Sequence, residues 1–189
     1  MMAEHDKPQV RTRLRRFTAD RSGAMAVEFA LVVAPLLFML FAIIELGLVF
    51  LMTSTLENAT TQAAREVRTG SLQKGGTATV ATFRKSICDQ LGWMQSQCNT
   101  NLKIDVRTFS EFSNPPVSDL NSSGGTFDPT KLKFELGAAG EIVLVRSFYT
   151  WTQITPFLPM GGLQEFTDAD SGKKSKQIIA AATFRNEPF

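Results

Sequence analysis

An apolar run near the N-terminus constrains this chain more than any other feature. Residues 29–44 carry no charge, and residues 46–52 continue the run after a single glutamate, Glu45. Counted from Ala24, the run is long enough to cross a bilayer, because about 20 residues of helix span a hydrocarbon core of about 30 Å. We predict a membrane-spanning helix rather than a buried core helix, since nothing else in the 189 residues could enclose so broad an apolar cylinder.

The flanks of this run predict its orientation. The first 23 residues contain six basic and three acidic residues, whereas the residues after Met52 offer no comparable positive charge. Positively charged flanks stay in the cytoplasm, so the C-terminal part is predicted to be translocated. A secretory signal peptide fits poorly, because its apolar region would be only about 7 to 15 residues long and would end in a small-residue cleavage motif.

The remaining composition argues against several functional classes. The whole chain has a formal charge of +2, so the part beyond the basic leader is close to neutral and lacks the clustered cationic face that nucleic acid requires. The single histidine, His5, lies in the leader, which leaves no histidine for a catalytic triad or a zinc site elsewhere. We predict no catalytic residue, metal, cofactor or small-molecule substrate.

Three residues interrupt the apolar character of the run. Glu28 and Glu45 are carboxylates whose burial in hydrocarbon would cost roughly 2.5 to 3.5 kcal/mol each. Glu28 is close to the cytoplasmic boundary, and Glu45 lies about 32 Å of helix beyond Ala24, so both are interpreted as interfacial carboxylates. Pro35 has no N–H and leaves the carbonyl of Leu31 without its helical partner, which predicts a kink or local unwinding.

A short motif overlaps the start of the run. Residues 22–29 read SGAMAVEF: a glycine after a basic leader, four small or apolar residues, a glutamate and an aromatic residue. The motif resembles the prepilin processing site of the TadE-like pseudopilin family of the tight-adherence (Tad, or Flp) pilus system. The likeness extends through the apolar run and into residues 58–71. It implies that a membrane-embedded prepilin peptidase cuts between Gly23 and Ala24 and leaves the helix on the mature protein.

The resemblance also implies a role for Glu28. After cleavage, Ala24 would carry a new ammonium group, four residues before Glu28. Pairing of Glu28 with that ammonium on a neighbouring subunit would neutralise two charges that hydrocarbon makes costly. The predicted processing site is therefore Gly23, Ala24, Glu28 and Phe29, with Glu28 as an assembly contact.

Beyond the membrane the helix is predicted to continue. A stripe at helical spacing marks one face, formed by Leu56, Thr60, Ala63 and Val67. Gly70 is a plausible residue just past the C-terminal end. A helix over about residues 24–69 would be about 69 Å long.

The last part of the chain predicts a small mixed domain. Thr77 is a candidate N-cap for a second helix to about Leu91, and Cys88 and Cys98 are predicted to form a disulfide in a translocated domain, with two free thiols as the alternative. Residues 102–109, 141–151 and 177–184 are strand candidates. Residues 110–130 are rich in Ser, Asn, Pro and Gly, which predicts an exposed loop whose role stays open.

Together these features predict an α+β, pilin-like fold with a basic cytoplasmic leader (1–23), a transmembrane helix with its extension (24–69) and an extracytoplasmic domain with a short antiparallel sheet (70–189). The resemblance implies a minor pseudopilin of an adhesive pilus, anchored in the inner membrane and acting in attachment and biofilm formation. Its expected partners are membrane lipid, a prepilin peptidase, other pilins or pseudopilins and pilus assembly proteins. The alternative is an uncleaved, membrane-anchored extracytoplasmic binding module or enzyme.

Overall fold

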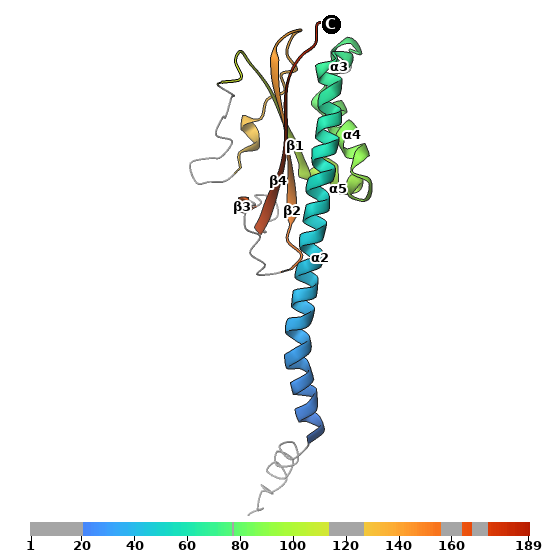
Figure 1. The fold of residues 1–189 in the computed structure, drawn as a ribbon, viewed down its shortest axis with the longest axis vertical. Helices are drawn as coiled ribbons and strands as arrows, with labels where there is room; N and C mark the ends of the chain where they lie inside the picture. Colours follow the sequence, from blue (N-terminus) through green and yellow to red (C-terminus); the bar gives the residue numbers. More distant parts are fainter. Residues whose placement is uncertain (1–20, 77, 114–126, 156–163, 168–173) are drawn as a thin grey trace, which may run out of the picture. The chain divides into compact units, whose positions relative to one another are not determined.

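The structure, a computed structural model of the chain, describes residues 21–76, 78–113, 127–155, 164–167 and 174–189 (Figure 1). Its helices are α2 (Arg21–Arg68), α3 (Ser71–Lys74), α4 (Val80–Gln90) and α5 (Gln95–Asn101), with short 3-10 helices η1 (Gly92–Met94) and η2 (Pro129–Lys131). Its strands are β1 (Leu102–Phe109), β2 (Ile142–Thr152), β3 (Gln164–Thr167) and β4 (Lys174–Arg185). This arrangement confirms the predicted α+β class with a long apolar N-terminal helix.

The chain divides into two compact units whose boundary lies inside α2. The N-terminal unit is Met1–Ile44 and the C-terminal unit is Glu45–Phe189. The boundary falls there because the later part of α2 contributes side chains to the hydrophobic core of the C-terminal unit. The three predicted segments (1–23, 24–69 and 70–189) depend on processing and topology, and they stay a prediction.

Helix α2 carries the predicted apolar stripe. Its members, Leu56, Thr60, Ala63 and Val67, are all at most 1% exposed, which confirms that this face of the helix packs into the core. The helix continues without a break across Pro35, and the kink predicted there stays a prediction.

Gly70 follows the end of α2 in a conformation that suits glycine. Its φ of 72° lies in the left-handed region, and the ring of Phe189 occupies the space that a Cβ would take. The C-terminus therefore packs beside the end of α2, as Figure 1 also shows near α3.

The four strands form one antiparallel sheet with the order β1-β2-β4-β3. Alternate residues of the strands face α2, α4 and α5 and build the core, as expected for a sheet buried on one face. They include Ile104, Val106, Val143, Val145, Tyr149, Ile178 and Ala180. The bounds of β1, β2 and β4 lie within three residues of the predicted strands, whereas the short strand β3 was not predicted.

A buried hydrogen bond ties α2 to the sheet. The Thr60 hydroxyl donates to the Ser147 hydroxyl of β2 across 2.9 Å, and both residues are at most 1% exposed. The bond allows a threonine to occupy the apolar stripe, because a buried hydroxyl is costly only without a partner.

We expect Thr60→Val to lower the free energy of unfolding by about 1 to 2 kcal/mol, because it leaves the Ser147 hydroxyl buried without its donor. Denaturant unfolding of a double-mutant cycle with Ser147→Ala measures the effect. The double variant should be more stable than the sum of the single losses predicts, by about 1 kcal/mol. Strict additivity would show that the two hydroxyls do not interact.

Helix α4 starts later than predicted. Its N-cap is Thr79, whose side chain accepts from the Thr82 N–H while the Thr82 hydroxyl accepts from the Thr79 N–H. The predicted cap, Thr77, lies outside the described residues, as do residues 1–20 of the leader and residues 114–126 of the predicted loop. Helix α4 ends at Gln90, close to the predicted end at Leu91.

A disulfide joins Cys88 of α4 to Cys98 of α5. Helix α5 was not predicted, because its sequence QSQCNTN shows no apolar periodicity. Cys98 is the one buried residue of this helix, so the disulfide itself supplies its attachment to the core.

Replacing both Cys88 and Cys98 by serine is expected to lower the free energy of unfolding by at least about 2 to 3 kcal/mol. Closing a loop of ten residues restricts the unfolded chain by about this amount. Thermal unfolding of the two forms, with and without reductant, measures the loss. A wild-type protein whose melting temperature did not respond to reductant would contradict the expectation.

Candidate membrane and assembly site

The described part of the N-terminal unit exposes apolar side chains in every direction. Residues 36–41 of α2 are consecutive, and each is 43% to 62% exposed. At 3.6 residues per turn, six consecutive residues point all around the helix. The core helix of a soluble domain would bury most of these side chains, so this surface requires lipid or other apolar helices as its surroundings.

Length and composition agree with this requirement. In the described part of the chain, Gly23–Arg68 is the one helix long and apolar enough to cross a membrane. The structure therefore contains a candidate single-pass anchor near the N-terminus.

The four predicted processing residues lie together near the described start of α2. Ala24 and Glu28 are one helical turn apart and therefore lie on the same side of the helix. Phe29 is 69% exposed, and Glu28 is also exposed. Within the described residues Glu28 forms no ion pair, so its carboxylate is available to another chain. The processing and assembly roles of these residues stay predictions.

Gly23 is not explained by the packing of its own chain. A Cβ placed on it would meet no other atom within 4 Å. Glycine inside a helix costs about 0.5 to 1 kcal/mol relative to alanine. The fold gains nothing from this glycine, so a requirement outside the folded chain is the better explanation for it.

Glu45 lies in a place that the sequence did not predict. It is only 2% exposed and belongs to the C-terminal unit. Its carboxylate accepts hydrogen bonds from the backbone N–H of Thr155 at 2.6 Å and of Ile154 at 2.8 Å. The indole N–H of Trp151 contributes a longer bond of 3.4 Å. The carboxylate is therefore hydrogen-bonded to its own chain rather than exposed to water, and its location near a membrane interface stays a prediction.

This group of residues, which we call the Glu45 clasp (Glu45, Trp151, Ile154 and Thr155), holds the end of β2 against α2. Where β2 ends at Thr152, the backbone N–H groups that follow lose their sheet partners and need another acceptor. A carboxylate meets this need well, since hydrogen bonds to charged groups contribute about 1.5 to 3 kcal/mol. A glutamate inside an apolar run was the available signal, because such a charge needs a partner.

Two carboxylates are buried in the described part of the chain, Glu45 and Asp105, and neither is free for acid–base chemistry. Asp105 is fully buried and accepts from Arg107, from Arg146 and from the backbone N–H of Lys133. Burial raises the pKa of the Tyr149 phenol, which keeps that core residue neutral. Among the described residues, no group of His, Cys, Asp and Glu could hold a metal ion.

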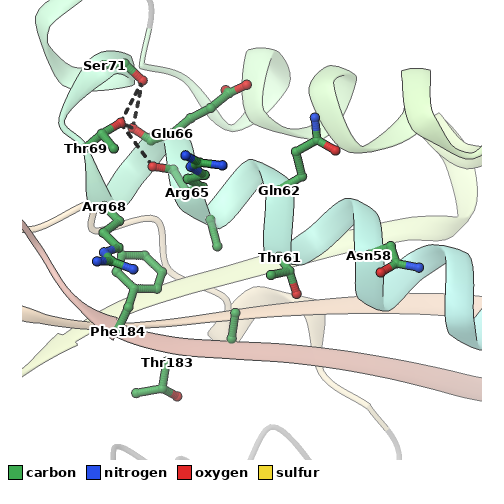
Figure 2. A pocket seen from close by; sticks show the side chains of 12 residues that line it. Asn58, Thr61, Gln62, Arg65, Glu66, Arg68, Thr69, Ser71, Thr183 and Phe184 are labelled. Carbon is green, nitrogen blue, oxygen red and sulfur yellow. Dashed lines mark hydrogen bonds between the residues drawn. The ribbon is translucent and has the colours of Figure 1, made fainter.

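An open groove of about 820 Å³ lies between α2 and β4 of the C-terminal unit (Figure 2). Asn58, Gln62 and Arg65 line it from α2, and Ala182, Thr183 and Phe184 line it from β4. The side chains of this lining are mostly polar, and the two walls belong to elements far apart in the sequence.

Comparison with known proteins adds one finding. Neither the curated proteins nor the solved structures gave a match to the chain. The family model described as "TadE-like protein" matches residues 23–65, which span the predicted processing site, the apolar run and most of the buried stripe of α2. That family is one of pilus components rather than enzymes. The chain thus contains a TadE-like segment, which confirms the resemblance drawn from its sequence and suggests a Tad pilus-associated protein.

Proposed function

We propose that this chain is a minor pseudopilin of a Tad (Flp) pilus system. Residues 24–44 cross the inner membrane, the basic leader stays in the cytoplasm and the C-terminal unit lies on the outer side. The observation that carries the proposal is the coincidence of the TadE-like match at residues 23–65 with a helix that exposes apolar side chains in every direction. The chain acts in building an adhesive pilus, and hence in attachment and biofilm formation.

A prepilin peptidase cuts between Gly23 and Ala24. In the intact chain this bond lies within α2, so the peptidase must unwind the helix locally before it can bind the backbone. Gly23 lowers the cost of this unwinding, because glycine stabilises a helix less than any residue except proline. Cleavage removes the positive leader and leaves the apolar helix whole.

The exposed apolar surface of α2 is covered partly by lipid and partly by the helices of other pilins or pseudopilins. The Ala24 ammonium created by cleavage pairs with Glu28 of a neighbouring subunit, which removes two unpaired charges from the hydrocarbon. Glu28 suits this contact because it is exposed on α2 and is one turn from Ala24.

The N-terminal sequence of the protein purified from its native membrane tests the proposal. We expect it to start at Ala24. We expect Gly23→Val to accumulate as the uncut chain, since an added Cβ has open space in the chain's own fold while the larger side chain interferes with the peptidase.

Gly47→Val is the matched control. Gly47 is also a glycine of α2 whose added Cβ would meet nothing within 4 Å, and it lies far from the cut. This variant should be processed normally. A wild-type protein that starts at Met1 or Met2 would instead support the uncleaved, membrane-anchored binding module or enzyme.

A further inference from the structure

Within the described residues, one edge of the sheet lacks a neighbouring strand over most of its length. β4 pairs with β2 along residues 175–185, but on its other side β3 pairs only with residues 174–177. Within the described residues, 178–185 therefore have a strand on one side only. The opposite edge differs, because Val106 of β1 donates to the Lys133 carbonyl and accepts from the Glu135 N–H.

The hydrogen-bond alternation identifies which backbone groups face the open edge. The Asn186 N–H donates to the Glu141 carbonyl at 2.8 Å, just beyond the paired residues Arg185 and Ile142. In an antiparallel ladder, successive residues alternate between bonding the partner strand and facing away from it. The N–H and C=O groups that face away from β2 are therefore those of Ile179, Ala181, Thr183 and Arg185.

The composition of this edge does not protect it. Natural edge strands are usually blunted by lysine, proline, bulges or inward-pointing charges. Residues 178–185 read IIAAATFR, with no proline and a single charge at the end. Three consecutive alanines, 180–182, allow another backbone to approach closely.

The groove provides room beside this edge. Its β4 wall is formed by Ala182, Thr183 and Phe184, and Figure 2 shows Asn58, Gln62 and Arg65 following one another along the facing helix. Within the described residues Arg65 forms no ion pair. An added strand would thus have a polar wall for its side chains and a cation suited to a carboxylate.

We propose that residues 178–185 of β4 bind an extended strand of a different protein of the pilus assembly, which extends the sheet and places an acidic side chain against Arg65. Backbone hydrogen bonds supply the affinity in this mode of recognition, and the side chains supply the specificity. A second copy of this chain is a poor donor for two reasons. Pairing of β4 with β4 would add the sequence IIAAATFR, which contains no carboxylate for Arg65. Pairing of β4 with β1 would need the β1 edge, which residues 133–135 occupy at Val106. This inference rests on the proposed function in one respect, namely that the partner strand comes from a protein of the pilus assembly.

Residue-resolved amide exchange of the full chain, alone in lipid nanodiscs and in pilus assemblies isolated from cells, tests the inference. In the chain alone, the amides of Ala180, Ala182 and Phe184 should exchange slowly, while those of Ile179, Ala181 and Thr183 exchange rapidly. In the assembly, the second set should slow by roughly tenfold or more, since each gains a hydrogen bond.

Three results would overturn the inference. The outward amides could already be protected in the isolated chain, which would mean that the chain covers its own edge. They could become protected with rising concentration of this chain alone, which would identify a second copy. They could also stay unprotected in the assembly.

Ala181→Pro removes one outward N–H and should leave the bonds to β2 intact. Proline is tolerated in an edge strand at positions whose N–H does not bond the neighbouring strand. We expect it to abolish the protection of Thr183 in the assembly, while Ala181→Thr, which keeps the N–H, retains it. If Ala181→Pro does not fold, Arg65→Glu is used instead. In assemblies that contain this variant, the protection of the Thr183 amide against exchange should be at least tenfold lower than in the wild type. The N-terminal sequence of each sample reports on the cleavage independently, so failure of this inference is distinguishable from failure of the proposed function.

Discussion

Replacing Glu45 by alanine is expected to lower the melting temperature of the C-terminal unit by about 6 to 16 °C. The change removes an acceptor shared by three donors and leaves the N–H groups of Ile154 and Thr155 without a partner, a loss of about 3 to 4 kcal/mol. For a unit of this size, each kcal/mol corresponds to about 2 to 4 °C. Thermal unfolding of the full chain in lipid nanodiscs, followed by tryptophan fluorescence, measures the shift.

Two variants make this measurement specific to the Glu45 clasp. Glu57 is exposed on the same helix, so Glu57→Ala should change the free energy of unfolding by no more than about 0.5 kcal/mol. Trp151→Phe removes only the 3.4 Å bond and should cost less than Glu45→Ala. Equal shifts for Glu45→Ala and Glu57→Ala would show that the clasp does not hold the unit together.

The clasp also illustrates what the sequence could not supply. A carboxylate in an apolar run indicated that Glu45 needed either hydration or a hydrogen-bonding partner. The interpretation as an interfacial carboxylate assumed hydration. The donors lie 106 to 110 residues further along the chain, in a turn whose position depends on how β2 packs on α2. No local pattern connects such distant residues, so only the tertiary structure reveals the contact.

Features with a local cause were predictable. The stripe of α2, its end before Gly70 and the strands β1, β2 and β4 follow from periodicity, turn chemistry and β-branched or aromatic residues. Helix α5 was not predicted, because a disulfide attaches it to the core instead of an apolar face with helical periodicity. The open edge of β4 was not predicted, because it depends on the order of the strands in the sheet, and residue patterns along one strand do not determine that order.

The predicted site falls between these cases. The positions of Gly23, Ala24, Glu28 and Phe29 on one apolar helix follow from sequence, and the TadE-like match covers all four. The chemistry that we propose for the site nevertheless involves other chains, a peptidase and a neighbouring subunit. A single chain can show only that Glu28 is exposed and that the fold does not require Gly23.

Glu28→Gln is expected to reduce incorporation into the pilus machinery by roughly 100-fold while leaving insertion in the membrane intact. Without the carboxylate, the Ala24 ammonium of the neighbouring subunit stays unpaired in hydrocarbon, at a cost of roughly 2.5 to 3.5 kcal/mol, whereas the neutral amide makes insertion of the variant itself no harder. The yield of sheared pili and the amount of the chain in membranes separate the two effects, and the N-terminal sequence verifies that the variant is still cut before Ala24.

Glu57→Gln, an equal change on the same helix outside the apolar run, should leave pilus yield unchanged. Glu28→Asp should recover part of the loss, because it restores the charge on a shorter side chain. Normal pilus yield with Glu28→Gln would show that the ammonium finds another partner and that Glu28 is not the assembly contact.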